Sequence, residues 1–190
     1  MPSEVSICNL ALTKIGEESI TSLGDDDKAG RLCNLHYALT RDMVLRTHNW
    51  NFATKRVELA ALVAAPEFRY AYQFALPTDC LKVVTTNLVP YAEWRLEDGN
   101  LLCDDDSVKI EYIARITDPN SFDALFVEVL ASRLAAEFAV PLADSITLSD
   151  QMFKLYTGKL REARSVDASE GTADGLDADA WLDARQVYNG

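Results

Sequence analysis

The side chains that most often do chemistry in proteins are few in this chain and poorly spaced for it. There are two histidines, His36 and His48, and no C-x-x-C pair. The four cysteines are far apart: Cys8, Cys33, Cys80 and Cys103. Zinc sites need closely spaced ligand pairs, so we predict no structural metal and interpret the cysteines as reduced, mostly buried thiols.

Two acidic runs, residues 25–27 and 104–106, are the candidates for calcium. Neither has the alternating acids, the glycine and the distal glutamate of an EF-hand loop, and helix capping or turn formation accounts for both. Phosphate-loop, dinucleotide and serine-nucleophile motifs are also missing. Carboxylate pairs can act as acid and base, but the sequence alone brings no pair to one cleft. We therefore predict no catalytic, cofactor-binding or metal-binding residues, and no enzymatic activity.

Composition narrows the class of protein further. The 190 residues are 48% hydrophobic and 25% charged, which is typical of a globular chain with one domain or two small subdomains. The net charge of -12 argues against sequence-reading DNA binding and against binding to an anionic membrane. The longest apolar run, residues 59–65, falls far short of the ~20 residues of a membrane span. Since residues 1–4 do not resemble a secretory signal, the expected location during synthesis is the cytoplasm.

Helical periodicity predicts four helices. The first covers residues 3–15 and ends at Gly16. The second covers residues 27–47, and its expected inner stripe is Leu32, His36, Leu39 and Met43. The third begins at Asp118-Pro119, ends before Pro141 and is expected to be the central helix. The fourth begins near Thr147 and loses its pattern from Ser165.

Between the second and third helices the pattern changes to that of strands. Trp50 and Phe52 follow the second helix, and large aromatics in this position usually fix the next segment to the core. Alternating residues predict strands between positions 70 and 113, with a hairpin turn at Asp98-Gly99. The sequence thus predicts an α+β fold, a helical bundle of about four helices (residues 1–52 and 117–168) with a small antiparallel β subdomain (residues 53–116) inserted between helices two and three.

Residues 169–190 are predicted to form a flexible acidic C-terminal tail, because they are acidic, contain glycine and cannot build a core alone. Their aromatic and apolar residues Trp181, Leu182 and Tyr188 are of the kinds that anchor interfaces, so we expect this tail to order on a partner. The second helix is locally basic, and Arg41 and Arg46 are the candidates there for contacts with an acidic surface.

Four segments, taken in order, resemble the tail tubular protein A family, the head-to-tail adaptors (connectors) of short-tailed bacteriophages. The first is the helix closed by Ile15-Gly16, followed by SITSL at 19–23 and an acidic loop. The second is HNWNFA at 48–53, and the third is LPTDCL at 76–81. The fourth is the helix through residues 122–138, followed by a charged helix and an acidic tail. The head-completion adaptor of long-tailed phages is a neighbouring possibility.

The resemblance implies a structural virion protein of a phage or prophage. Such proteins form an oligomeric ring, dodecameric on the portal, that joins the portal protein to the tail nozzle protein. The ring would be a conduit for DNA, without sequence-specific binding, and would help to retain the packaged genome. The implied fold is a helical bundle with an inserted β domain, and the implied location is the neck of the virion. No cofactor is implied, and no binding residue is carried over from the family.

Two other classes remain open from the residues alone. One is a bacterial scaffold or binding protein, unrelated to phage, that docks through its acidic tail. The other is a small hydrolase with an acidic site. The oligomeric state in solution separates the ring from both.

Overall fold

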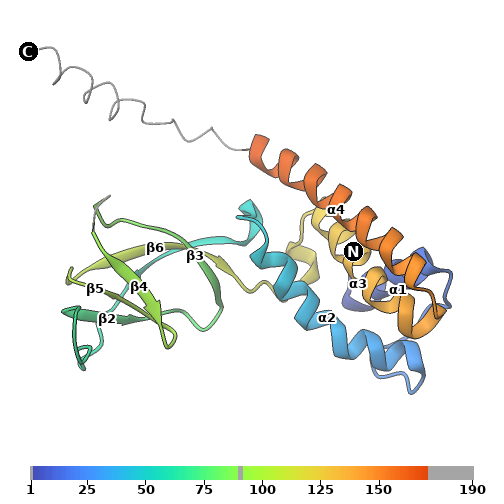
Figure 1. The fold of residues 1–190 in the computed structure, drawn as a ribbon, viewed down its shortest axis with the longest axis horizontal. Coiled ribbons are helices and arrows are strands. Elements are labelled where there is room, and N and C mark those ends of the chain that lie inside the picture. The colour runs from blue at the N-terminus through green and yellow to red at the C-terminus, as the bar shows by residue number, and fades with distance from the viewer. Residues whose placement is uncertain (1, 90–91, 171–190) are drawn as a thin grey trace, which may run out of the picture.

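The computed structural model describes residues 2–89 and 92–170, and the chain forms two lobes there (Figure 1). One lobe contains four α-helices, and the other contains six strands in two antiparallel sheets. All six strands lie between α2 and α3 in the sequence. The predicted α+β fold, a helical bundle with an inserted β subdomain, is confirmed.

The helical lobe consists of α1 (Glu4–Ile15), α2 (Lys28–Arg46), α3 (Ala124–Ala143) and α4 (Ile146–Ser169). α3 contacts the other three helices, and half of its twenty residues are buried. Its fully buried residues include Phe126, Leu130, Leu134 and Phe138. The prediction of a central third helix is therefore confirmed.

The ends of the first two helices follow their capping residues. The Ser3 side chain accepts a hydrogen bond from the Ser6 N–H and caps α1, and Gly16 ends that helix at φ 81°. A left-handed conformation of this kind suits glycine. The Asp27 carboxylate accepts from the Gly30 N–H and caps α2. Both predicted helices are confirmed to within a residue at each end.

Both predicted ends of the third helix and the predicted C-terminal end of the fourth are wrong. Asp118 caps a separate 3-10 turn, Pro119–Ser121, whereas Asp123 caps α3 by accepting from two backbone N–H groups. Pro141 lies inside the last turn of α3, so the helical hydrogen bond that its missing N–H removes is close to the end of the helix. α4 is capped by Ser145 and begins at Ile146, within one residue of the predicted start near Thr147, but it continues to Ser169, beyond the predicted loss of pattern at Ser165.

The β lobe is a small two-layer stack. One sheet has the order β1 (Thr54–Leu59), β6 (Val108–Ala114), β3 (Cys80–Thr86). The other has the order β2 (Tyr72–Ala75), β5 (Asn100–Cys103), β4 (Trp94–Glu97). Phe74 and Leu101 from one sheet and Val108 and Ile110 from the other share a buried cluster. The β4–β5 turn has Asp98 at φ 47° and Gly99 at φ 74°, as the hairpin prediction requires.

Trp50 fixes the junction of the two lobes. Its side chain is 1% exposed, and its ring lies edge-on to Phe126 of α3 with centroids 5.2 Å apart. The indole N–H donates to the Val44 carbonyl oxygen of α2. The chain therefore leaves the bundle at a fixed point, and the predicted anchoring role of Trp50 is confirmed.

Further polar contacts join the lobes beside Trp50. Arg46 at the end of α2 donates to the Leu81 carbonyl oxygen of β3. Lys82 donates to the Asn49 side chain at 2.9 Å, and Arg115 donates to the Asp42 carboxylate at 2.7 Å. These contacts hold the base of the β lobe against α2.

Candidate interaction surfaces

Helix α2 has two apolar faces, and the sequence prediction placed the wrong one inside. The buried face carries Cys33, Tyr37 and Val44, together with the buried polar residues Thr40 and Arg41. Of the predicted inner stripe, Leu32 and His36 are only half-buried, whereas Leu39 and Met43 are exposed. At 3.6 residues per turn, the two faces are about 150° apart around the helix.

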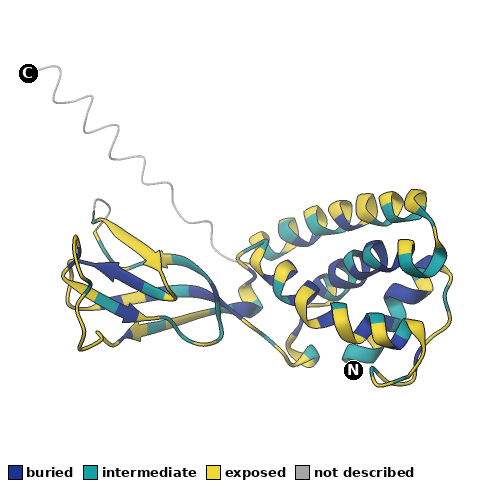
Figure 2. Cartoon of the chain, turned by 60° about the horizontal axis from the view of Figure 1, so that its bottom comes forward, coloured by how far each residue is buried: buried dark blue, intermediate teal, exposed yellow. Residues whose placement is uncertain are grey.

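The outward face of α2 carries an uncovered apolar row. Leu35, Leu39 and Met43 follow one another at four-residue spacing and are 62%, 69% and 43% exposed. We call these three residues the α2 outer stripe. Figure 2 shows the exposed side of the helices in the bundle. A row of large apolar side chains on a rigid helix is a typical partner-binding surface.

Charges of both signs surround the α2 outer stripe. Exposed Lys28 lies toward its N-terminal end, where Arg31 is already paired with Asp26, and exposed Arg46 lies at its C-terminal end. The acid on this face, Asp42, is already held by Arg41 and Arg115. The surface therefore favours a partner that is mainly apolar.

The two arginines proposed for contact with a partner are engaged within the chain. Arg41 is 5% exposed and pairs with Asp42 at 2.8 Å, so its guanidinium is not available to a partner surface. Arg46 is exposed but donates to the Leu81 carbonyl oxygen. The structure thus leaves Arg46 as a surface cation and removes Arg41. The other proposed residues, Trp181, Leu182 and Tyr188, lie outside the described residues.

The C-terminal end of α4 is fixed beside the C-terminal end of α2. The Asp167 carboxylate accepts from His48 Nε2 at 2.9 Å and from the Asn51 N–H at 3.0 Å. Asn51 Nδ2 donates to the Asp167 carbonyl oxygen at 2.7 Å, and Arg164 donates to the Thr47 carbonyl oxygen. The helical pattern was predicted to end at Ser165, but Asp167 lies inside α4. In the structure, Asp167 fixes the last turns of α4 beside the end of α2.

An apolar loop forms a second exposed surface, at the end of the β lobe away from the bundle (Figure 1). Residues 60–66 carry no charge, and Val63 and Phe68 are among the exposed large hydrophobic residues. The Leu62 N–H donates to the Gln73 carbonyl oxygen, and the Gln73 amide donates to the Ala64 carbonyl oxygen, both at 2.8 Å. The loop is thus held against β2. In the sequence, this run served only to exclude a membrane span. Its lack of charged residues was the feature from which an apolar surface could have been predicted.

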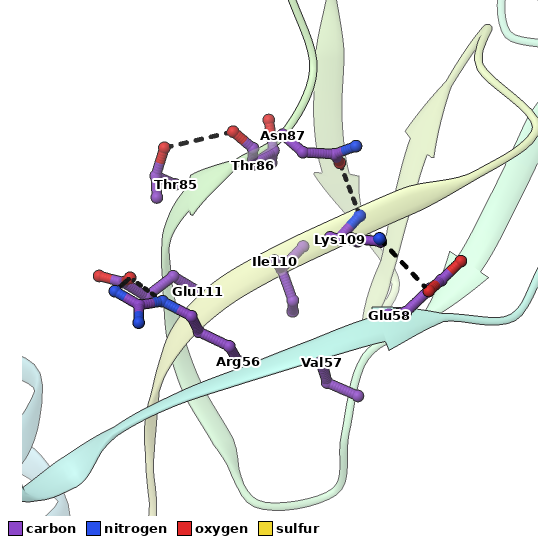
Figure 3. A pocket seen from close by; sticks show the side chains of 9 residues that line it. All are labelled: Arg56, Val57, Glu58, Thr85, Thr86, Asn87, Lys109, Ile110 and Glu111. Carbon is purple, nitrogen blue, oxygen red and sulfur yellow. Dashed lines mark hydrogen bonds and ion pairs between the residues drawn. The ribbon is translucent and has the colours of Figure 1, made fainter.

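A shallow hollow of about 500 Å³ lies over the β1-β6-β3 sheet (Figure 3). Its charged side chains pair with one another, Arg56 with Glu111 at 2.7 Å and Lys109 with Glu58 at 3.7 Å. The Lys109 N–H donates to the Asn87 side-chain oxygen at 2.6 Å. Ion pairs that face water on a sheet are typical of a solvated surface, and this arrangement offers no single unpaired carboxylate as a base.

The perturbed titratable groups have structural causes. The Lys55 ammonium, 2.8 Å away, and the Tyr112 hydroxyl hold the pKa of Asp79 below its usual value. Burial and the neighbouring Asp79 raise the pKa of Tyr112 to about 12. A hydrogen bond with Cys33 and burial raise the pKa of the Cys8 thiol. All four cysteines are free, as expected, and only Cys80 is not fully buried.

Metal ligands do not gather in the described part of the chain, where no three His, Cys, Asp or Glu side chains converge. Within residues 2–89 and 92–170, none of the helices is long and apolar enough to cross a membrane. No protein-family model matches the chain, and no curated protein matches it either.

Proposed function

We propose that the protein is a head-to-tail adaptor of a bacteriophage or prophage, a structural protein that forms a ring between the portal and the tail nozzle. The observation that carries the proposal is the order of the elements. A β subdomain lies between the second and third helices of a four-helix bundle, which is the arrangement that the resemblance implies.

Two of the segments that carry the resemblance meet at the junction of the lobes. HNWNFA supplies His48 and Trp50, which join α2, α3 and α4. LPTDCL leads into β3 and supplies Leu81, whose carbonyl oxygen accepts from Arg46. Both segments hold the β lobe on the bundle. This shared structural role supports treating them as parts of one resemblance.

The proposed role is non-enzymatic and needs surfaces instead of a catalytic site. The α2 outer stripe and the loop at residues 60–66 are both apolar, and they lie on different lobes (Figure 1). Two different patches on one chain suit heterologous contacts, which close into a ring when the rotation between copies permits it. The partners are then other copies, the portal protein and the nozzle protein. DNA would pass without sequence-specific binding, in keeping with the net charge of -12.

The mass of the assembly tests the proposal. We expect native mass spectrometry and electron microscopy to show a ring with a central opening, either for the concentrated protein alone or after mixing with the portal protein of the same phage. The virion neck is the expected location, and the host cytoplasm is where the free protein accumulates during assembly. Immunogold labelling of virions locates it directly.

A protein that stays monomeric and does not bind the portal would exclude the adaptor role. Binding to a bacterial protein through the acidic C-terminal segment would then favour the scaffold class. To test whether the α2 outer stripe takes part in assembly, the variant Leu39→Asp is compared with the control variant Ile146→Asp. Both residues are exposed to a similar degree, 69% and 73%, but Ile146 begins α4 and is not part of the stripe.

A further inference from the structure

Strand β4 forms an open edge of its sheet. The sheet has the order β2-β5-β4, and all four residues of β4 are exposed (Figure 2). Among residues 2–89 and 92–170, no segment other than β5 forms backbone hydrogen bonds with this strand. A row of unpaired N–H and C=O groups at a sheet edge is a template for pairing with another strand.

The other three sheet edges are protected. The edge of β2 is covered, because Ala61 forms a bridge with Phe74 and the Leu62 N–H donates to the Gln73 carbonyl oxygen. β1 carries three exposed charged side chains, and β3 is irregular, with two shifts of register against β6. Charged side chains and bulges are common means by which an edge strand avoids pairing.

The hydrogen bonds of the hairpin define which backbone groups of β4 face outward. The Leu76 N–H donates to the Gly99 carbonyl oxygen at 3.1 Å, so the backbone of Gly99 points toward β2. The direction alternates along a strand, so the residues of β5 that oppose Arg95 and Glu97 point toward β4. Arg95 and Glu97 therefore bond to β5, and the N–H and C=O groups of Leu96, between them, face outward.

The side chains of β4 divide between the two faces of the sheet. Trp94 and Leu96 oppose buried residues of β5 and so point toward the other sheet. They stand at its edge and are still 39% and 43% exposed. Arg95 and Glu97 point to the opposite face, where their side chains lie 3.4 Å apart. A strand placed beside β4 would therefore bond to Leu96 and cover apolar surface.

The order of the charges makes β4 its own complement. When two copies lie antiparallel with Leu96 opposite Leu96, Arg95 of each copy lies opposite Glu97 of the other. Opposite charges in this position stabilise a strand pair, and like charges destabilise it. A register with Arg95 opposite Arg95, or with Glu97 opposite Glu97, brings like charges together. A shift of one residue would bring the apolar face of one copy to the charged face of the other.

We propose that two copies of the chain pair through β4, edge to edge, and join their three-stranded sheets into one antiparallel sheet. The two Leu96 residues exchange N–H to C=O hydrogen bonds, and two Arg95–Glu97 ion pairs form across the contact. The contact is two-fold and closes after two copies. It is also small, so it forms at high protein concentration or where many copies are held together.

This contact differs from those proposed for the ring. It uses neither the α2 outer stripe nor the loop at residues 60–66, which lies beside β2 at the opposite edge of the sheet. The inference therefore does not depend on ring formation.

Charge reversal tests the register. In Arg95→Glu two acids of one copy oppose two acids of the other, and in Glu97→Arg bases oppose bases. We expect the dissociation constant of the pair to rise about ten-fold in either variant, because both symmetric contacts change together. An equal mixture of the two variants should pair like the wild type, because every acid of one chain then opposes a base of the other. The doubly reversed protein should also pair like the wild type.

Analytical ultracentrifugation at up to about 1 mM protein measures the pairing, since a contact of millimolar affinity is populated there. Native mass spectrometry identifies the mixed pair, because the two variants differ in mass. Association through other surfaces, ring formation included, is the same in all these proteins. The difference between the mixture and either variant alone therefore measures the β4 contact.

Two further variants serve as controls. Arg31→Glu reverses an ion-paired arginine of the helical lobe, whose side chain is 61% exposed against 56% for Arg95, and it should pair like the wild type. Leu96→Pro removes the N–H that faces outward and keeps the bonds to β5, and an edge strand accepts proline at such a position. We expect Leu96→Pro to abolish the pairing. Circular dichroism checks that each variant is folded.

Three results would overturn the inference. One is a wild-type protein that associates no more than Leu96→Pro, which would leave β4 for a strand of a different protein. Another is association of Arg95→Glu and Glu97→Arg, each alone, that is as strong as that of the wild type. The third is a mixture of these two variants that associates no more strongly than either one alone.

Discussion

Asp167 provides the most direct test of how the bundle fixes the end of α4. We predict that Asp167→Ala lowers the free energy of unfolding by about 3 kcal/mol. Its carboxylate is 11% exposed and accepts from His48 Nε2 at 2.9 Å and from the Asn51 N–H at 3.0 Å. Hydrogen bonds to a charged group contribute about 1.5–3 kcal/mol each, and the lower end applies to both bonds because the site opens to water on one side. For a chain of this size, the loss lowers the melting temperature by about 6–12 °C.

Urea unfolding, followed by circular dichroism and by tryptophan fluorescence, measures this effect. His48 also lies edge-on to Trp50, with centroids 4.9 Å apart, so His48→Ala alone mixes two losses. A double-mutant cycle of His48→Ala and Asp167→Ala separates them, and we expect a coupling energy of about 1 kcal/mol. The control is Glu162→Ala, whose partly exposed ion pair with Lys159 contributes about 0.5 kcal/mol or less. An Asp167→Ala protein as stable as that control would refute the assignment.

Three further outcomes are expected. Leu45→Ala should lower the free energy of unfolding by about 2–5 kcal/mol because Leu45 is fully buried, whereas Leu39→Ala on the same helix should change it by about 0.5 kcal/mol or less. Urea midpoints compare the two variants, and equal losses of stability would contradict the assigned faces of α2. Arg41→Glu should destabilise the fold by about 3–5 kcal/mol, because it leaves a second carboxylate beside Asp42 in a buried site; a melting temperature near that of the wild type would place Arg41 on the surface. The lowered pKa of Asp79 means that its stabilising effect is present above about pH 4 and is lost as the pH falls further; Asp79→Asn should flatten the fall in urea midpoint between pH 5 and pH 3, and an unchanged slope would refute the effect.

The sequence predicted the fold class and most of the elements because their signals are local. Ser3, Gly16 and Asp27 cap helices by contacts with nearby residues, and Asp98-Gly99 needs only its own backbone conformation. Trp50 also behaved as its size predicts. Each of these signals depends on a few neighbouring residues, so it can be recognised in the sequence without knowledge of the packing.

The errors occurred where the outcome depends on packing between distant elements. The two faces of α2 are both apolar, and the less apolar one, which includes Thr40 and Arg41, packs inside. β1 was not predicted as a separate strand, because Lys55, Arg56 and Glu58 face water and its partner, β6, lies more than forty residues away. Pro141 was treated as a stop, although the last turn of α3 accommodates it.

The surfaces were harder to predict than the fold. Leu39 and Met43 look like core residues in the sequence, and only the packing of α3 against the other face of α2 shows that they are exposed. Arg41 looks like a surface cation until its burial beside Asp42 is known. The role of Asp167 depends on His48 and Asn51, 119 and 116 positions away.

The way in which the β lobe joins the bundle determines how it carries mechanical load. β1 leaves the bundle and β6 returns to it, with Thr54 opposite Ile113 near the bundle and Leu59 opposite Val108 at the far end. A pull on the far end stretches both strands in the same direction, so two covalent chains share the tension and the hydrogen bonds between these strands are not sheared. Bending is opposed by the Arg115–Asp42 pair and by the bond from Arg46 to β3. The lobe therefore behaves as a stiff lever, and force applied at its tip reaches Trp50 and the core of the bundle.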